Sequence, residues 1–357
     1  MDPIAHTLVG AALAKSGLEN RSGFSAAALI VGANLPDIDG LTYFVSSDLG
    51  LYFRRGWTHG LPAIALCPFV LAGALWLLDR SFGRRRARFA ALFWLSLIAI
   101  ATHPALDWLN NYGMRWLMPF EDGWFYGDAL FIVDPWIWLA LGGALFLATS
   151  GGTLRLVAWV VAAVALTVLV LTGVPGLLPA KLLFVAGLLG LAAARARNLP
   201  RTASGRERLH RSALVLVMTY VLLMVALSSL ARRWTLERLE EDGHEVETLM
   251  VGPTPMSPFI KDVVFSTPSS YRHGSLSLGG SMRIALSPDV IPRNETHPLA
   301  VRALAAPEAR GFAAWARFPW AEVEEEPDGV RVILRDARYA RSRESAGFGT
   351  AAVFLGR

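Results

Sequence analysis

The sequence predicts a mainly α-helical protein that crosses a membrane several times and ends in a β-rich domain outside the membrane. Three observations lead to this fold class. First, 54% of the 357 residues are hydrophobic and only 18% are charged, which is a membrane-like balance. Second, the chain up to about residue 230 alternates long apolar blocks with short basic loops. Third, hydropathy falls after residue 230, where short segments separated by Pro, Gly and Ser begin.

The first 40 residues predict a short helical hairpin. Residues 4–18 and 24–33 are apolar, and each is shorter than the roughly 20 residues that a full span requires. A polar turn at 19–23 separates them, and the polar residues of 34–39 end the second helix. We therefore expect this hairpin to enter the bilayer without crossing it. The N-terminus has no basic segment and no cleavage motif, so we do not expect a secretory signal peptide.

Six further apolar blocks have about the length of a full span. They are residues 61–78, 89–106, 129–148, 154–171, 177–194 and 212–230. The loops at 79–88 and 195–211 are rich in arginine, and such loops are typical of the cytoplasmic side. The net charge of +5 comes largely from these loops, so it indicates membrane topology and not nucleic-acid binding.

Counting spans from either basic loop gives one orientation for the chain. It places the start of the block at 61, the end of the block at 106 and everything after 230 on the extracytoplasmic side, which is the periplasm in a Gram-negative cell. The polar and aromatic residues of 41–57 form a predicted loop on that side. We therefore expect three regions along a multi-pass protein of the bacterial inner membrane. They are a membrane-embedded core at 1–150, additional transmembrane helices at 151–230 and a soluble, β-rich extracytoplasmic domain at 231–357.

The third region predicts short strands and a few helices. Residues 232–241 are expected to form a helix that leaves the membrane, and 298–306 and 308–316 to form short helices. The expected strands are residues 246–251, 261–265, 271–278, 282–286, 330–334 and 351–355.

His103 and Asp107 are the first indication of a functional site. They are four residues apart at the end of the apolar block 89–106, so on a helix they project from one face. An imidazole and a carboxylate placed in this way can hold one metal ion. Ionisable residues at membrane depth are costly and usually have a function. The alternative is a hydrogen bond between the two side chains that packs one helix against another.

Further side chains that can bind a metal or a phosphate fall on the same predicted side of the membrane. They are His6, Asn34, Asp37, Asp39, Arg54, Arg55, Thr58, His59, Asn110, Glu121, Asp122, Asp128 and Asp134. Imidazole and carboxylate groups suit Zn²⁺ or two hard or borderline divalent ions, and an arginine can hold a phosphate through two hydrogen bonds. Each piece also has a structural interpretation: a helix cap at 34–39 or at 128–134, and an interfacial anchor at 54–59.

The order and spacing of several motifs carry a family resemblance over about residues 1–150. The motifs are Asp2-Pro3-x-x-His6-Thr7, Asn34-Leu35-Pro36-Asp37-Ile38-Asp39, Arg54-Arg55-Gly56-Trp57-Thr58-His59-Gly60, His103-Pro104-x-x-Asp107-Trp108-Leu109-Asn110 and Trp124-Phe125-Tyr126-Gly127-Asp128. They resemble the YdjM-like (YbcI/YdjM) family of membrane-bound metal-dependent hydrolases, which is distantly similar to zinc-dependent phospholipase C.

The resemblance implies both a fold and a site. The implied metal ligands are His6, Asp37, Asp39, His59, His103 and Asp107, and the residues expected to take part in catalysis are Asp39, Arg54, Arg55, Asn110 and Asp128. The chain lacks the additional His and Glu ligands that complete a three-metal cluster in phospholipase C. We therefore expect one or two divalent ions, with zinc ahead of magnesium and manganese.

The functional hypothesis is an integral inner-membrane hydrolase that cleaves a phosphoester of a lipid or lipid-linked substrate at the outer leaflet. Acyl-ester or amide hydrolysis would use the same metal chemistry. Membrane lipids are the expected partners, and no nucleic acid is expected. The alternatives are a metal or lipid transporter, which requires polar residues through the middle of the spans, and a scaffold with a structural metal. The apolar blocks between 154 and 230 contain almost no polar residues of that kind.

Overall fold

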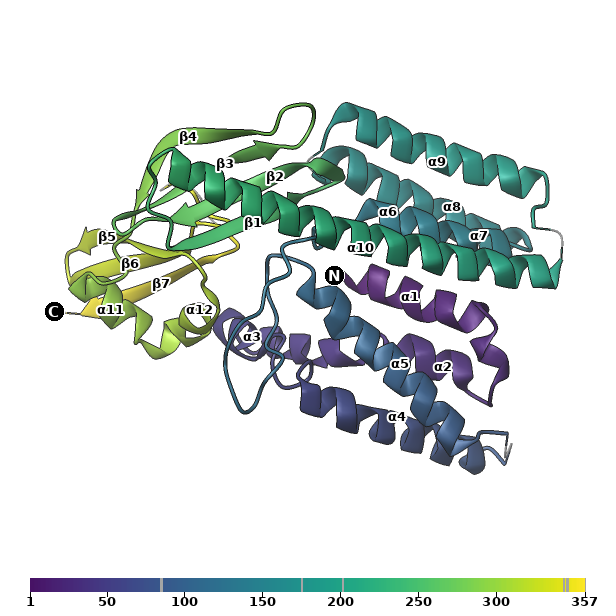
Figure 1. Cartoon of the computed structure of the whole chain (residues 1–357). Coiled ribbons are helices and arrows are strands. Elements are labelled where there is room, and N and C mark those ends of the chain that lie inside the picture. Colours follow the sequence, from purple (N-terminus) through teal and green to yellow (C-terminus); the bar gives the residue numbers. More distant parts are fainter. Residues whose placement is uncertain (84–85, 175, 201, 343, 345–346, 357) are drawn as a thin grey trace. The chain divides into compact units, whose positions relative to one another are not determined.

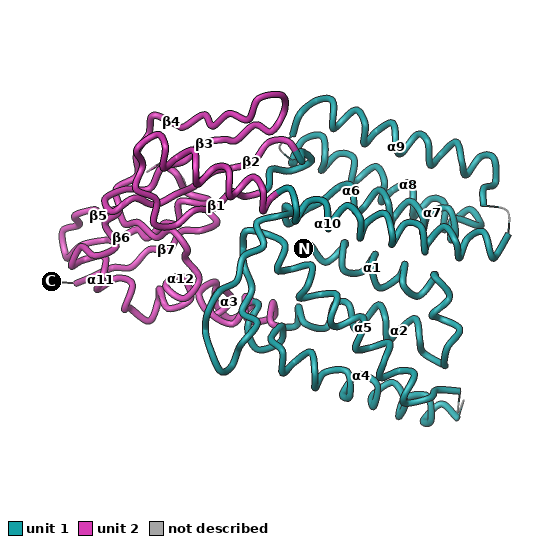
Figure 2. The backbone as a smooth tube through the Cα atoms, viewed as in Figure 1, with its two compact units in different colours: residues 1–38, 55–227, 253–258 teal, residues 39–54, 228–252, 259–357 magenta. Residues whose placement is uncertain are grey.

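The computed structural model describes residues 1–83, 86–174, 176–200, 202–342, 344 and 347–356. These residues form two compact units (Figure 2). Unit 1 contains residues 1–38, 55–227 and 253–258, and unit 2 contains residues 39–54, 228–252 and 259–357. The prediction of a helical part with apolar spans followed by a domain of antiparallel sheets is confirmed.

Unit 1 begins with the expected pair of short helices. Asp2 caps the first helix, because its carboxylate accepts a hydrogen bond from the Ala5 amide at 3.0 Å. Gly10 lets the two helices approach closely, since an added Cβ there would lie 2.6 Å from the Leu29 carbonyl oxygen. The elements are α1 (Pro3–Lys15), η1 (Leu18–Asn20) and α2 (Ser25–Gly32).

Two long apolar helices, α4 (Leu61–Ser81) and α5 (Phe89–Trp108), pack against each other and against α2 (Figure 1). Their ends match the predicted blocks to within a few residues. Small side chains bring these helices together, because an added Cβ on Gly32 would lie 2.9 Å from the Ala99 Cβ. The N-terminal end of α4 and the C-terminal end of α5 lie together, away from the basic loop that connects the two helices.

The expected span at 129–148 differs from the helix that forms. The helix starts only at Pro135, because Asp134 caps it with hydrogen bonds from the amides of Trp136 and Ile137. Ala129 and Leu130 instead donate their amides to the Leu109 carbonyl. The resulting helix is too short to count as a full span. Its parts are α6 (Pro135–Ile137), the π-helical turn η3 (Trp138–Gly142) and α7 (Gly143–Thr149).

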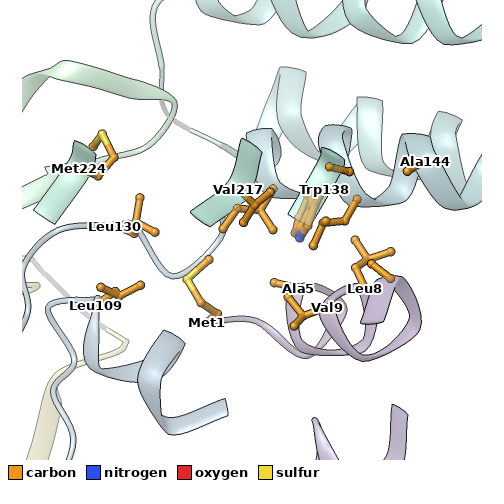
Figure 3. Packing of buried hydrophobic residues seen from close by; sticks show 14 of the residues in the cluster. Met1, Ala5, Leu8, Val9, Leu109, Leu130, Trp138, Ala144, Val217 and Met224 are labelled. Carbon is orange, nitrogen blue, oxygen red and sulfur yellow. The ribbon is translucent and has the colours of Figure 1, made fainter. Parts of the chain in front are cut away.

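Among the described residues, five helices are long and apolar enough to cross a membrane, where the sequence predicted about six. Besides α4 and α5, they are α8 with the π-helical turn η4 (Thr153–Val168 and Leu169–Gly173), α9 (Leu178–Ala196) and α10 (Ala203–Glu241). A buried apolar cluster joins α1 to these later helices (Figure 3). In this cluster Met1, Ala5 and Val9 lie near Trp138 and Val217, so the N-terminal helix is held by residues from distant parts of unit 1.

Unit 2 contains two antiparallel sheets, four-stranded in the order β1-β2-β3-β4 and three-stranded in the order β5-β6-β7. The strands are β1 (Thr248–Thr254), β2 (Ser257–Ser266), β3 (Ser270–Ser277), β4 (Arg283–Pro292), β5 (Pro319–Glu326), β6 (Gly329–Asp336) and β7 (Thr350–Gly356). Between β4 and β5 come α11 (Pro298–Leu304), η5 (Pro307–Ala309) and α12 (Arg310–Trp315). Strand β5 was not predicted.

A segment from the N-terminal half of the chain belongs to unit 2. Residues 41–57, predicted as a loop, contain the end of η2 (Leu35–Phe44) and the helix α3 (Ser47–Phe53). Ser46 starts α3 by accepting a hydrogen bond from the Leu49 amide at 3.1 Å. The Asp48 carboxylate accepts hydrogen bonds from the amides of Gly311 at 2.6 Å and Phe312 at 3.3 Å, which fastens α3 to α12.

A buried ion pair stabilises the three-stranded part of unit 2. The carboxylate of Asp336, at the end of β6, accepts hydrogen bonds from the Arg317 amide at 2.7 Å and from the Arg338 guanidinium at 2.8 and 3.0 Å. Both side chains of the pair are fully buried. Burial alone would raise the pKa of Asp336, but the Arg338 charge and these hydrogen bonds lower that pKa below its usual value.

Replacing Asp336 should therefore destabilise unit 2. Asp336→Asn leaves the Arg338 charge buried without its counter-ion, so we expect the free energy of unfolding to fall by about 3 to 5 kcal/mol. The measurement is hydrogen exchange of residues 310–340 in the full chain, with Asp328→Asn at an exposed turn position as the control. Exchange in Asp336→Asn no faster than in the control would contradict this role.

The same pair predicts a pH dependence. Because the folded-state pKa of Asp336 lies below its unfolded value of about 3.9, the stabilisation is complete above that value and is lost as the pH falls through the folded pKa. The stability of unit 2, followed by the same exchange measurement, should therefore fall in acid in the unmodified chain. The part of this fall that belongs to Asp336 should be missing in Asp336→Asn.

Candidate metal centre

Four side chains from unit 1 converge at the joined ends of α2, α4 and α5. They are Asp37, His59, His103 and Asp107. Asp37 follows α2 in the first turn of η2, His59 lies in the turn before α4, and the other two lie on the last turns of α5. One ligand atom from each lies within 4.8 Å of the other three. The prediction of a His/Asp group that could hold a metal ion is confirmed at this level.

The separations of the two imidazole nitrogens from each other and from the two carboxylates are close to what one ion requires. The two imidazole Nε2 atoms lie 3.1 Å apart. The Asp37 carboxylate lies 3.3 Å from His103 and 3.8 Å from His59, and the Asp107 carboxylate lies 3.4 Å from His59 and 3.7 Å from His103. A tetrahedral ion with bonds of about 2.0 to 2.2 Å separates its ligand atoms by roughly 3.3 to 3.6 Å. The four side chains therefore fit one small divalent cation.

Hydrogen bonds on the far side of each imidazole fix its orientation. The Nδ1 of His103 lies 2.7 Å from the carbonyl oxygen of Ala33. A carbonyl can only accept, so this nitrogen carries the proton and, in the neutral ring, Nε2 keeps its lone pair toward the other three groups. The Nδ1 of His59 lies 2.9 Å from the Thr58 hydroxyl, which can donate or accept, so this contact fixes the direction of the second ring without assigning its proton.

The chemistry of the group favours a cation as the fifth partner. The side chains of His59, His103 and Asp107 are fully buried, and that of Asp37 is 16% exposed. Two imidazole nitrogens face each other beside two carboxylates in this buried group, so negative potential is concentrated there. Mixed imidazole and carboxylate ligands suit Zn²⁺ and related divalent ions. The partly exposed Asp37 marks the side on which the group meets the surface.

Arg55 holds the Asp107 ligand from behind. Its buried guanidinium places Nε 2.9 Å from the Asp107 carboxylate and donates from Nη1 to the Asn110 side-chain oxygen at 2.8 Å. The Nη1 also donates to the carbonyl of Gly113 at 3.2 Å, and the guanidinium stacks over the Tyr112 ring at 4.6 Å. These contacts tie the turn after α5 to the Asp107 carboxylate.

His6 lies beside the four side chains and is not one of them. Its Nε2 lies 3.2 Å from the second oxygen of Asp107, and its ring stacks on His103 with 3.7 Å between centroids. The α-amino group of Met1 also pairs with Asp107. The start of the chain therefore supports the same carboxylate that Arg55 holds.

The remaining predicted residues have other surroundings. Asp39 and Arg54 form an ion pair with each other in unit 2 and are not among the four. Asn110 binds Arg55 and accepts from the Tyr112 amide at 3.0 Å, so it lies behind the Asp107 ligand. Asp128 is a buried residue with a left-handed backbone, φ +48°, in the loop that follows α5.

Sequence reasoning missed two supporting features. Arg115 is buried, its amide donates to the Arg55 carbonyl at 3.0 Å, and its guanidinium lies 3.2 Å from Asp122. Its position in an aromatic loop near an acidic residue was the available signal. The Ala33 carbonyl that orients His103 had no signal in the sequence, because any residue offers that group.

Comparison with known proteins finds a family match to the part of the chain that carries the site. Residues 1–176 match the family described as YdjM inner membrane protein, and this region contains all four converging side chains. The Bacillus subtilis (strain 168) protein named Uncharacterized protein YfhP is 26% identical over 126 residues, which are 35% of this chain and 37% of YfhP. The chain thus aligns with little more than a third of that relative. No solved structure matches the chain. The part of the chain that carries the site, residues 1–176, is therefore similar to the YdjM inner membrane proteins.

Proposed function

We propose that this inner membrane protein is a metal-dependent hydrolase that cleaves a phosphoester of a lipid or lipid-linked substrate at the outer leaflet. The observation that carries the proposal is the convergence of Asp37, His59, His103 and Asp107 at the ends of apolar helices. A buried group of this kind is costly within a membrane protein unless it binds something. Its position at the helix ends, and not at their middle, favours chemistry at the membrane surface over transport.

In this proposal the four side chains hold one Zn²⁺, with Mg²⁺ or Mn²⁺ as other candidates. When bound, such an ion polarises a phosphoryl oxygen and makes water more acidic. The protein's own part is to fix its ligands. Ala33 sets the proton on His103, and Arg55, itself held by Asn110, pairs with the Asp107 carboxylate and orients it. Arg55, expected from the sequence to hold a phosphate, is buried against Asp107, so we propose that it supports this carboxylate instead.

The side of the membrane follows from the arginine-rich loop. The four side chains lie at the N-terminal end of α4 and the C-terminal end of α5, whereas residues 79–88 connect the opposite ends of these helices. Because basic loops face the cytoplasm, we propose that the site faces outward. The second arginine-rich stretch, residues 195–211, lies at the start of α10, and by the same rule we propose that residues 231–357, which follow the apolar part of α10, form a periplasmic domain.

A second candidate, a scaffold with a structural ion, has its own supporting observation. Four protein ligands already complete a tetrahedral site, and three of them are fully buried. Structural zinc sites are closed in this way, while catalytic sites keep one position open. The hydrolase proposal requires that the exposed side at Asp37 leave room for substrate.

The first test measures metal content and turnover together. The protein is purified in detergent, bound metal is determined by mass spectrometry, and phosphoester hydrolysis is followed with bilayer phospholipids. We expect about one ion per chain and measurable hydrolysis, and His103→Ala with Asp107→Ala should remove both, because two of four ligands are lost.

The control for that test is His244→Ala with Asp242→Ala, which alters the same residue types at the end of α10 and should change neither quantity. Full metal content and activity in the His103/Asp107 variant would end the proposal. The scaffold would be favoured by a different result: the unmodified protein binds the ion, the His103/Asp107 variant loses it, and neither hydrolyses any phosphoester, acyl-ester or amide substrate.

The second test concerns Arg55. Arg55→Ala removes the group that orients Asp107, and loss of such a supporting partner typically weakens metal binding about 10- to 100-fold. Metal affinity is measured by competition with a chelator of known affinity. Arg115→Ala is the matched control, because it removes a buried arginine that contacts Asp122 and should lower stability without weakening the ion. Equal or tighter metal binding in Arg55→Ala would contradict the supporting role.

A further inference from the structure

An apolar surface on unit 2 stands out from the rest of that unit. We define the 41–53 surface by the exposed apolar side chains of this segment, which are Leu41, Tyr43, Phe44, Val45, Leu49 and Phe53. Phe44 and Val45 are 88% and 74% exposed, so these side chains face away from unit 2 almost completely. Large contiguous apolar patches are rare on soluble surfaces and indicate a binding partner.

The segment that carries this surface is held firmly from its polar side. Asp48 fastens α3 to the amides of Gly311 and Phe312, and the Arg310 guanidinium donates to the Tyr52 hydroxyl at 2.7 Å while it stacks on the Tyr52 ring at 4.2 Å. The Tyr43 ring packs on Gly50, where an added Cβ would lie 2.2 Å from it. The segment is therefore an ordered element of unit 2 with one polar side and one apolar side.

The near-absence of charged residues in the segment favours lipid as the binding partner of its exposed side. Asp48 is the only charged residue between positions 41 and 53, and its carboxylate is bound to α12. The exposed residues of the segment are therefore all uncharged: six apolar side chains together with Ser46 and Ser47. Aromatic side chains such as Tyr43, Phe44 and Phe53 gather where proteins meet the boundary between lipid headgroups and acyl chains. A protein partner would more often be matched by a rim of charged groups around such a patch.

The place of the segment in the sequence, between α2 and α4, also favours lipid as the partner. The segment follows the hairpin α1–α2 and precedes α4, whose apolar span begins at Leu61. Between them lies Trp57, whose exposed side chain is a further interfacial residue type. A short apolar element whose chain enters a membrane span a few residues later has lipid within reach.

We propose that the 41–53 surface inserts into the outer boundary of the bilayer and docks unit 2 on the membrane. Phe44 and Val45 enter the acyl region, while Asp48 and Tyr52 keep the element attached to α12. Unit 2 would then bind lipid through this surface, in addition to containing the two antiparallel sheets. It does not depend on the proposed hydrolysis.

The test uses a site-specific nitroxide label in the full chain, reconstituted in nanodiscs of phosphatidylethanolamine and phosphatidylglycerol. Cys67 is the only cysteine, so Cys67→Ala gives a background without thiols. A label is then attached through Val45→Cys. The matched control is Val290→Cys on β4, a valine that is 52% exposed on the same unit. Collisions with oxygen, which concentrates in lipid, and with a water-soluble nickel chelate are measured for both.

We expect the ratio of oxygen to nickel collisions at position 45 to exceed the ratio at position 290 several-fold. Equal ratios would show that the surface is in water, and shielding of position 45 from both reagents would show that protein covers it. Either result overturns the inference. The measurement needs neither bound metal nor turnover, so its outcome is separate from that of the hydrolase proposal.

Discussion

The buried carboxylate of Asp107 is the constraint on which unit 1 depends. A full negative charge at the end of an apolar helix is costly unless other groups compensate it. Here the compensation comes from Arg55 at 2.9 Å, from the His59 imidazole at 3.4 Å and from the start of the chain through His6. These partners lie on three different segments, so the charge of one residue determines how those segments meet.

The packing of unit 1 serves this arrangement. Gly10 and Gly32 let α1 and α5 approach α2 closely, which brings the Ala33 carbonyl within 2.7 Å of the His103 ring. The orientation of that ring, and with it the lone pair of Nε2, is therefore set by backbone packing at the end of a neighbouring helix. Such support is what a metal site requires, because a ligand that can rotate away binds an ion weakly.

Much of the helical part could be predicted because its signal is local. The length of an apolar run gives the ends of α4 and α5 directly, and a spacing of four places His103 and Asp107 on one helix face. Asp37 and His59 could be grouped with them only through the predicted orientation of the spans and through the family resemblance. The loss of the span expected at 129–148 has a local cause as well, since Asp134 and Pro135 are a helix start that the hydropathy pattern conceals.

Features that arise from pairing distant segments could not be predicted. Strand β5 ends in consecutive glutamates, which are unfavourable in strands. The neighbouring strand β6 compensates their charge, because Arg331 pairs with Glu326 and Arg335 pairs with Glu322. These partners are not visible in the sequence of β5 itself. In the same way, nothing in residues 41–57 indicates that Asp48 will cap α12, which lies more than 250 positions later. The sequence of residues 41–57 predicts a loop because α12, which this segment contacts, lies far away in the sequence.

The central claim is that Asp37, His59, His103 and Asp107 hold one ion, and X-ray absorption at the metal edge of the purified protein tests it most directly. The account predicts a first shell of nitrogen and oxygen atoms at about 2.0 to 2.2 Å, with the outer-shell scattering of two imidazole rings. That imidazole scattering should disappear when both His59 and His103 are replaced by alanine. A first shell of water oxygens alone, or imidazole scattering that survives this replacement, would contradict the account.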